Sequence, residues 1–178
     1  MVDDVTQITI VLPFSASFEL TNRSDNSIQL RYSSEGEYQE QLGIKSRIEE
    51  EILFLREYLN PLFRAPNDKL GAHKVIATKL SLSVPKNSIV QLKMQQGLLK
   101  ANGEFKELFV ELNSGECQLN LENTTGLFKS DFARLLLNSD QMGVIHQPSG
   151  KSLPCSSEQS EAQFKIISQL SLVNCIPR

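Results

Sequence analysis

Val90-Gln91-Leu92-Lys93-Met94 opens the stretch of sequence that decides the fold, which runs on to His146. Apolar and polar residues alternate in this segment, and they alternate again further along, in Cys117-Gln118-Leu119-Asn120-Leu121. Such a period of two is typical of half-buried β-strands. The glycines of the stretch are Gly97, Gly103, Gly115, Gly126 and Gly143. The pattern predicts many short strands between glycine turns and leaves no room for long helices.

The same stretch contains internal sequence repeats at uneven spacings. Leu112-Asn113-Ser114 returns as Leu137-Asn138-Ser139 at an offset of 25 residues, and Phe109 and Phe128 lie 19 residues apart. Repeats of this length are typical of stacked coils that bury a thin inward stripe against their neighbours. Asn, Ser and Gly suit the corners of such coils because they tolerate left-handed backbone conformations. We therefore expect a short β-solenoid.

Further strands are predicted on the N-terminal side. Alternation runs from Ile8 to Leu12, from Ser17 to Leu20 and from Ser27 to Tyr32, with turn-forming residues in between. Residues 74–84 form the longest strand candidate. Pro85 ends it, at a position where no backbone N–H is needed to donate to a neighbouring strand. This part of the chain is typical of an antiparallel meander.

Residues 40–60 fit two structures. Apolar residues from Ile44 to Leu59 recur at spacings of three and four, which is the pattern of a helix face. The segment from Leu42 to Ile48 also alternates, so that Glu49-Glu50 would form the tip of a β-hairpin. A lone helix would conflict with neighbouring strands, and Pro61 ends the segment in either case.

Size and composition restrict the class of protein. The chain has 178 residues, 40% of them hydrophobic, which is enough for one β domain with a real core. A net charge of -3 argues against a nucleic-acid partner, and no apolar run is long enough to cross a bilayer. Met1-Val2-Asp3-Asp4 is acidic, unlike a signal peptide. The protein is cytosolic, or its export signal lies outside this sequence.

No motif carries catalytic, cofactor-binding or metal-binding chemistry. His73 and His146 are the only histidines and have no ligand partners at zinc spacing. The chain has three cysteines, Cys117, Cys155 and Cys175, which is an odd number without a C-x-x-C spacing. A disulfide bridge between Cys155 and Cys175 stays an open alternative. We therefore expect no catalytic residue, no cofactor and no metal.

Four segments resemble a known family. They are Pro66-Asn67-Asp68-Lys69-Leu70-Gly71-Ala72-His73-Lys74-Val75-Ile76-Ala77, Leu82-Ser83-Val84-Pro85-Lys86, Gly103-Glu104-Phe105-Lys106-Glu107-Leu108 and Asn113-Ser114-Gly115-Glu116-Cys117. Over roughly residues 27–146 the chain is similar to the bacterial putative-adhesin family of flavobacterial type, an adhesin-like β-solenoid domain of unknown function. The resemblance implies strands over residues 40–60. It also implies export or a place in the cell envelope, although the usual secretion signal is absent here.

Together these observations predict one all-β domain over residues 1–178. The N-terminal antiparallel meander would occupy residues 1–85, and a short single-chain β-solenoid would occupy residues 86–178, ending in strands at 164–167 and 170–173. We expect a non-enzymatic surface or scaffold module that binds a protein, a glycan or its own copies. The candidate binding surface is the loop from Pro66 to Lys74, because loops held on a rigid scaffold often carry function. Its residues are Asn67, Asp68, Lys69, His73 and Lys74.

Two other functions stay open. A lyase or hydrolase of β-helix type would need acids from adjacent coils in one column along a groove. The available acids are Glu104, Glu107, Glu111, Glu116, Glu122, Asp131 and Asp140. A cytosolic structural module is the other alternative, favoured by the missing signal.

Overall fold

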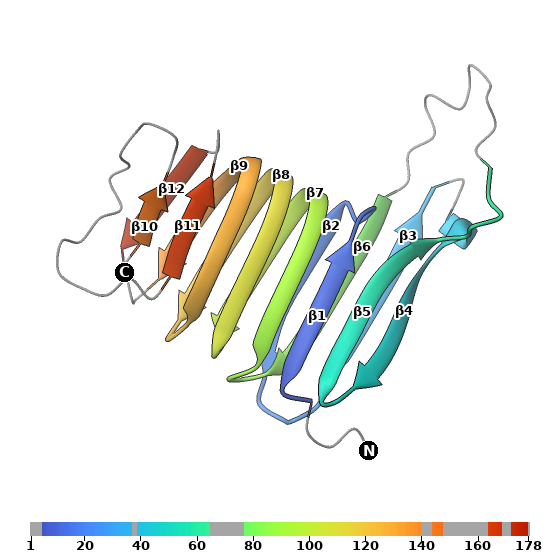
Figure 1. Ribbon diagram of the computed structural model, residues 1–178, viewed down its shortest axis with the longest axis horizontal. Coiled ribbons are helices and arrows are strands. Elements are labelled where there is room, and N and C mark those ends of the chain that lie inside the picture. The colour runs from blue at the N-terminus through green and yellow to red at the C-terminus, as the bar shows by residue number, and fades with distance from the viewer. Residues whose placement is uncertain are drawn as a thin grey trace.

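The computed structural model describes residues 5–36, 39–64, 77–139, 144–147, 164–168 and 172–177 (Figure 1). The strands are β1 (Gln7–Leu12), β2 (Ser17–Arg23), β3 (Gln29–Glu35), β4 (Leu42–Glu49), β5 (Ile52–Leu59), β6 (Ala77–Pro85), β7 (Ile89–Glu104), β8 (Glu107–Glu122), β9 (Thr125–Ser139), β10 (Val144–Gln147), β11 (Phe164–Ser168) and β12 (Leu172–Pro177). One 3-10 turn, η1 (Gln39–Gln41), precedes β4. These ranges contain no α-helix, and the predicted all-β class is confirmed.

The three longest strands stack in parallel at a constant offset. Each residue of β7 pairs with the residue 18 positions later in β8, and β8 pairs with β9 in the same way. Leu92, Val110 and Phe128 therefore lie in one line across the strands. The offsets of 25 and 19 residues were wrong as repeat lengths, because Leu112 pairs with Ser130 and not with Leu137.

The glycines bend strands and do not separate them. The first half of β7 pairs with β1 and its second half pairs with β2, with Gly97 between the halves. Gly97 and its neighbour Gly115 have φ angles of 127° and 119°, which lets the backbone turn a corner while the ladder continues. The predicted short strands of this region are thus long bent strands.

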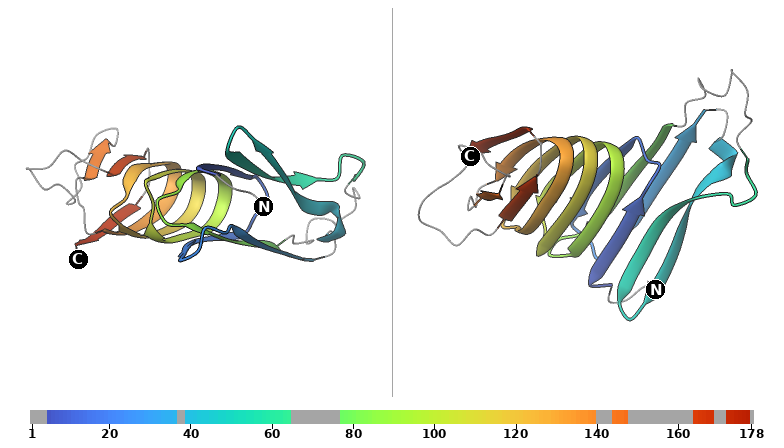
Figure 2. Two further views of the ribbon diagram at one scale, coloured as in Figure 1. Left: turned by 90° about the horizontal axis from the view of Figure 1, so that it is seen from below. Right: turned by 45° about the horizontal axis from the view of Figure 1, so that its top comes forward.

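The bent sheet has two faces around a common core. We call the first the front face, in the order β4-β5-β1-β7-β8-β9-β11-β10, and the second the back face, in the order β3-β6-β2-β7-β8-β9-β12. Figure 2 shows the two layers in its left view. We call a rung the segment on the front face together with the segment that follows it on the back face. A rung is either one bent strand, such as β7, or two consecutive strands, such as β1 and β2.

Alternating side chains of both faces fill the space between them. Ile8, Ile10 and Leu12 point inward from β1, and the burial pattern of this strand alternates as its sequence predicts. Phe18 on β2 and Phe128 on β9 are among the largest fully buried side chains of the same core cluster. Each such aromatic ring contributes roughly 1.5–3 kcal/mol by leaving water.

The prediction that the N-terminal strands form an antiparallel meander was wrong for β1 and β2. β1 and β2 do not pair with each other but lie on opposite faces, where each pairs in parallel with both of its neighbours. The corner between them is fixed by Ala16, whose N–H donates to the Thr78 carbonyl and whose carbonyl accepts from the Leu98 N–H. Residues 7–23 are therefore a rung inserted between two others. Alternation shows which side chains point inward but not which strand is the neighbour.

Residues 42–59 form a β-hairpin, so the strand prediction is confirmed and the helical alternative was wrong. β4 and β5 pair antiparallel, with Glu49 opposite Ile52. The tip lies one residue later than predicted, at Glu50 and Glu51, which have φ angles of 47° and 65°. Two successive residues with positive φ match the right-handed twist of the flanking strands.

Candidate functional site

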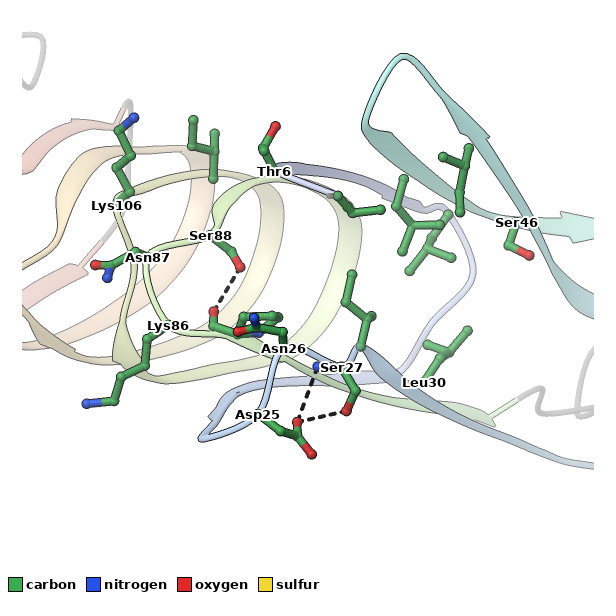
Figure 3. Close-up of a pocket in the computed structure, with 17 residues that line it drawn as sticks. Thr6, Asp25, Asn26, Ser27, Leu30, Ser46, Lys86, Asn87, Ser88 and Lys106 are labelled. Atoms are coloured by element: carbon green, nitrogen blue, oxygen red, sulfur yellow. Dashed lines mark hydrogen bonds between the residues drawn. The ribbon is translucent and has the colours of Figure 1, made fainter. Parts of the chain in front are cut away.

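An open pocket of about 990 Å³ lies at the end of the stack where β3 and β4 are the outer strands (Figure 3). Its walls come from β3, from the β4–β5 hairpin, from the loop at residues 25–28 and from the turn at residues 86–88. The aliphatic side chains of its lining are Val5, Ile28, Leu30, Ile48, Leu53, Leu55 and Ile89. A concave site that combines apolar side chains with several polar groups is typical of ligand-binding pockets.

The pocket exists because the two faces diverge at this end. In the left view of Figure 2 the β4–β5 hairpin curves away from β3. Along β4 the inward positions become progressively open, from Leu42, which is 8% exposed, to Ile48, which is 48% exposed. On the inner strands β1, β6 and β8 the inward-pointing apolar side chains are buried. The exposed aliphatic groups therefore belong to a core that is left uncovered.

Hydrogen bonds hold the rim of the pocket in place. Arg23 donates two hydrogen bonds to the carboxylate of Asp25, at 2.8 and 2.9 Å, and Ser27 donates another at 2.8 Å. These donors, with the Arg23 guanidinium first, hold the pKa of Asp25 well below its usual range. On the opposite wall Ser88 donates to the Pro85 carbonyl at 2.8 Å. The rim is thus a fixed polar border around an aliphatic floor.

The polar groups of the pocket lining are mostly engaged in hydrogen bonds and ion pairs. No histidine or cysteine lines it, and the hydroxyl groups of Ser27 and Ser88 already donate to other acceptors. Lys86 pairs with Glu104 at 3.2 Å. The Ser27 hydroxyl lies next to the Asp25 carboxylate, but the Arg23 guanidinium lowers the pKa of that carboxyl, which makes it a poor base for activating a nucleophile.

The acids considered for an enzyme do not form a column in the described ranges. Glu104 and Glu122 are neighbours in register on β7 and β8, but Glu104 is paired with Lys86. Glu111 lies between Lys93 and Lys129, and Glu116 lies beside Arg134. Asp140 lies outside the described residues. Only Glu104 and Glu122 stack as a pair among the described acids, and Glu104, Glu111 and Glu116 each lie next to a cation.

A buried carboxylate joins the two faces behind the pocket. Glu57 on β5 is 1% exposed and accepts from the Phe14 N–H at 2.7 Å. It also accepts from the hydroxyl groups of Ser15 at 3.1 Å and Thr78 at 2.9 Å. Thr78 belongs to β6, so the carboxylate connects the front face to the back face. Three donors aimed at one buried group indicate a structural role.

The predicted loop cannot be compared with these sites. Asn67, Asp68, Lys69, His73 and Lys74 lie outside the described residues, so their role stays a prediction. The possible bridge between Cys155 and Cys175 also lies outside them, as does the side chain of His146. The sequence analysis missed Ile28, Leu30 and Ile48. Their alternation was visible, but it did not show that the outer strands leave them uncovered.

Cys117 gives a testable measure of how closed the core is. Its thiol is 1% exposed, and burial raises its pKa well above the usual value. With Cys155 and Cys175 changed to serine, we expect no reaction of the native protein with Ellman's reagent at pH 8, because the thiolate is the reactive form. Full reaction should appear in guanidinium chloride. Rapid labelling of the native variant would contradict the packing of β8.

The described ranges also lack two other features, a metal-ligand cluster and a membrane-spanning helix. No group of three or more His, Cys, Asp or Glu side chains converges there as a metal site would require. No helix there has the length and apolar character that a bilayer crossing needs.

The fold resembles that of a solved structure. A crystal structure described as a putative cell adhesion protein from Clostridium sporogenes superposes with a TM-score of 0.64, at 10% identity, over 98% of this chain and 93% of that chain. A crystal structure described as a putative adhesin from Bacteroides fragilis also shares 10% identity, over 97% and 92% of the two chains, with a TM-score of 0.37. No family model and no curated protein matches the sequence.

The first of these likenesses shows a shared fold. At 10% identity it says nothing of a shared ligand or activity. The second has too low a TM-score to support an argument. The adhesin-like fold that the sequence resemblance implies agrees with the first neighbour, whereas its flavobacterial type receives no support.

Proposed function

We propose that this chain is a non-enzymatic, adhesin-like binding module in which the rungs form one β-solenoid domain over residues 1–178. The observation that carries the proposal is the open pocket of about 990 Å³ with its aliphatic floor. The likeness to a protein described as a putative cell adhesion protein supports the same role. Such a module would act at the cell envelope. We propose that its ligand is an extended segment of a protein partner.

The neighbouring edges favour an extended peptide. In the described part of the chain β3 pairs only with β6, and β4 pairs only with β5, so each presents an unpaired edge beside the pocket. A partner segment can add to such an edge through main-chain hydrogen bonds while alternate side chains enter a pocket. The aliphatic floor would take apolar side chains. Lys86 and Lys106 on the rim favour an acidic residue beside them.

Selection from a library of displayed random peptides tests this function. We expect the selected peptides to alternate apolar residues and to carry an acidic residue at one end. Ile48→Asp places a charge on the pocket floor and should weaken their binding by at least about tenfold, because a charge would be buried without a partner. Titration calorimetry with one selected peptide gives the affinity, and the melting temperature checks the fold.

A matched control is available on the back face. Leu136 is a partly exposed aliphatic residue on β9, well outside the pocket lining. Leu136→Asp should leave the peptide affinity unchanged. Equal loss of binding in both variants, or selected peptides that bind Ile48→Asp as tightly as the native protein, would overturn the proposal.

A further inference from the structure

The outer surface of the front face carries two neighbouring rows of side chains, fixed by the register. We call the first the basic row, which contains Lys45, Arg56, Val11, Lys93, Glu111 and Lys129 in the order of the strands. We call the second the apolar row, which contains Phe54, Thr9, Gln91, Phe109, Leu127 and Lys165. Burial alternates along these strands so that both rows point away from the core.

The basic row concentrates positive charge on an acidic protein. Four cations share it with one carboxylate, in a chain whose net charge is -3. The side chains of Lys93 and Lys129 are 61% and 55% exposed. Arg56, Lys93 and Lys129 occur on every second strand, about 9.6 Å apart at the usual strand spacing. The row is a ladder of regularly spaced cations.

Glu111 keeps two of these cations at a fixed spacing. Its carboxylate lies 3.2 Å from Lys93 Nζ and 3.7 Å from Lys129 Nζ. One carboxylate between two lysines neutralises only part of their charge. Exposed ion pairs of this kind are weak, so a ligand carboxylate can replace Glu111 at little cost.

The apolar row lies beside these cations. A shallow groove of about 460 Å³ is lined by Phe109 and Leu127 together with Lys93 and Lys129. Further along the row, the Arg47 guanidinium lies 4.8 Å from the centre of the Phe54 ring, which orients a further cation along the same face. Apolar side chains on an outer sheet face beside fixed cations indicate a contact surface and not a merely solvated one.

We propose that the basic and apolar rows together bind a linear anionic glycan. The apolar face of a sugar ring can stack on Phe109 and Leu127 while its carboxylate pairs with Lys93 or Lys129. A polymer in which acidic sugars alternate with neutral ones carries charges at intervals of two sugar units, which suits cations on every second strand. An acidic peptide fits less well, because the main-chain groups in the middle of the face are already paired between strands.

This glycan site is separate from the end pocket. The two sites share no residue of their linings, so each can be tested while the other is intact. Hyaluronate oligosaccharides are a suitable probe because glucuronate alternates with an uncharged sugar. We expect binding that weakens as salt is added, and no binding of neutral dextran.

Variants of the two rows test each part of the proposal. Lys93→Gln with Lys129→Gln should weaken hyaluronate binding by about tenfold. Phe109→Leu should weaken it by about threefold, because the ring is lost while an apolar group stays. Glu111→Gln should strengthen it, since both lysines lose their competing carboxylate. Lys79→Gln is the matched control, because Lys79 is 60% exposed and paired with Glu35 but lies on the back face.

Three results would overturn the glycan site. One is equal binding of poly-glutamate and hyaluronate with no effect of Phe109→Leu, which would indicate unspecific attraction of polyanions. Another is the same loss of affinity in Lys79→Gln as in the double lysine variant. The third is the absence of hyaluronate binding at low salt by a protein whose melting temperature and circular dichroism spectrum are normal.

Discussion

Replacing Gly115 by valine is expected to lower the free energy of unfolding by about 3–5 kcal/mol. Gly115 has a φ of 119°, a conformation that side chains with a Cβ rarely adopt. A Cβ atom at this position would also overlap the backbone carbonyl of Gly97 on the neighbouring strand. Because that carbonyl belongs to the paired backbone of β7 and β8, it cannot move without disrupting the bend of these strands. Urea denaturation followed by circular dichroism gives the change.

Gly43→Ala is the matched control for this prediction. Gly43 lies outside the left-handed region, and the nearest atoms to a Cβ there belong to the side chain of Tyr58, at 2.9 Å. Tyr58 is partly exposed and can shift, so we expect a loss below about 1 kcal/mol. Similar losses in the two variants would show that the corner conformation of Gly115 is unimportant.

Replacing Glu57 by alanine is expected to cost about 3–5 kcal/mol as well. The change removes the common acceptor of the Phe14 N–H and of the Ser15 and Thr78 hydroxyl groups. The Phe14 N–H and the Ser15 hydroxyl would then lose this buried acceptor, Thr78 would keep only the Phe14 carbonyl at 3.3 Å, and a cavity would separate β5 from β6. Chemical denaturation measures the loss of stability.

Two variants separate this explanation from a general effect of charge. Glu57→Gln keeps one acceptor oxygen and should cost less than Glu57→Ala, because only part of the hydrogen bonding is lost. Glu116→Ala removes a carboxylate that is 56% exposed and should change stability by less than about 0.5 kcal/mol. A Glu57→Ala protein as stable as Glu116→Ala would contradict the structural role of the buried carboxylate.

The class of the fold could be predicted because alternation reports directly which side chains are buried. β1 and β6 follow their predicted alternation, and the strands over residues 42–59 were predicted from alternation together with the family resemblance. The pairing could not be predicted in the same way. Alternation is identical for a parallel rung and an antiparallel meander, and a glycine in a turn looks the same as a glycine inside a bent strand.

The two sites differ in how far the sequence could have shown them. Lys93, Glu111 and Lys129 recur at intervals of 18 residues, so the correct repeat length would have placed them side by side. Asn102, Asn120 and Asn138 recur at the same interval and were a visible sign of it. The end pocket had no such sign. Leu30 and Ile48 look like ordinary core residues until the faces are seen to diverge.

The inserted rung formed by β1 and β2 determines the order in which the chain can assemble. Its neighbours on the front face are β5 and β7, and those on the back face are β6 and β7. A ribosome therefore completes this rung before any of its neighbours, and its apolar side chains lack complete native cover until residue 104 has emerged. Contacts between such distant segments make folding slow. The inserted rung of β1 and β2 is thus synthesised early, but its last neighbour, β7, is synthesised late.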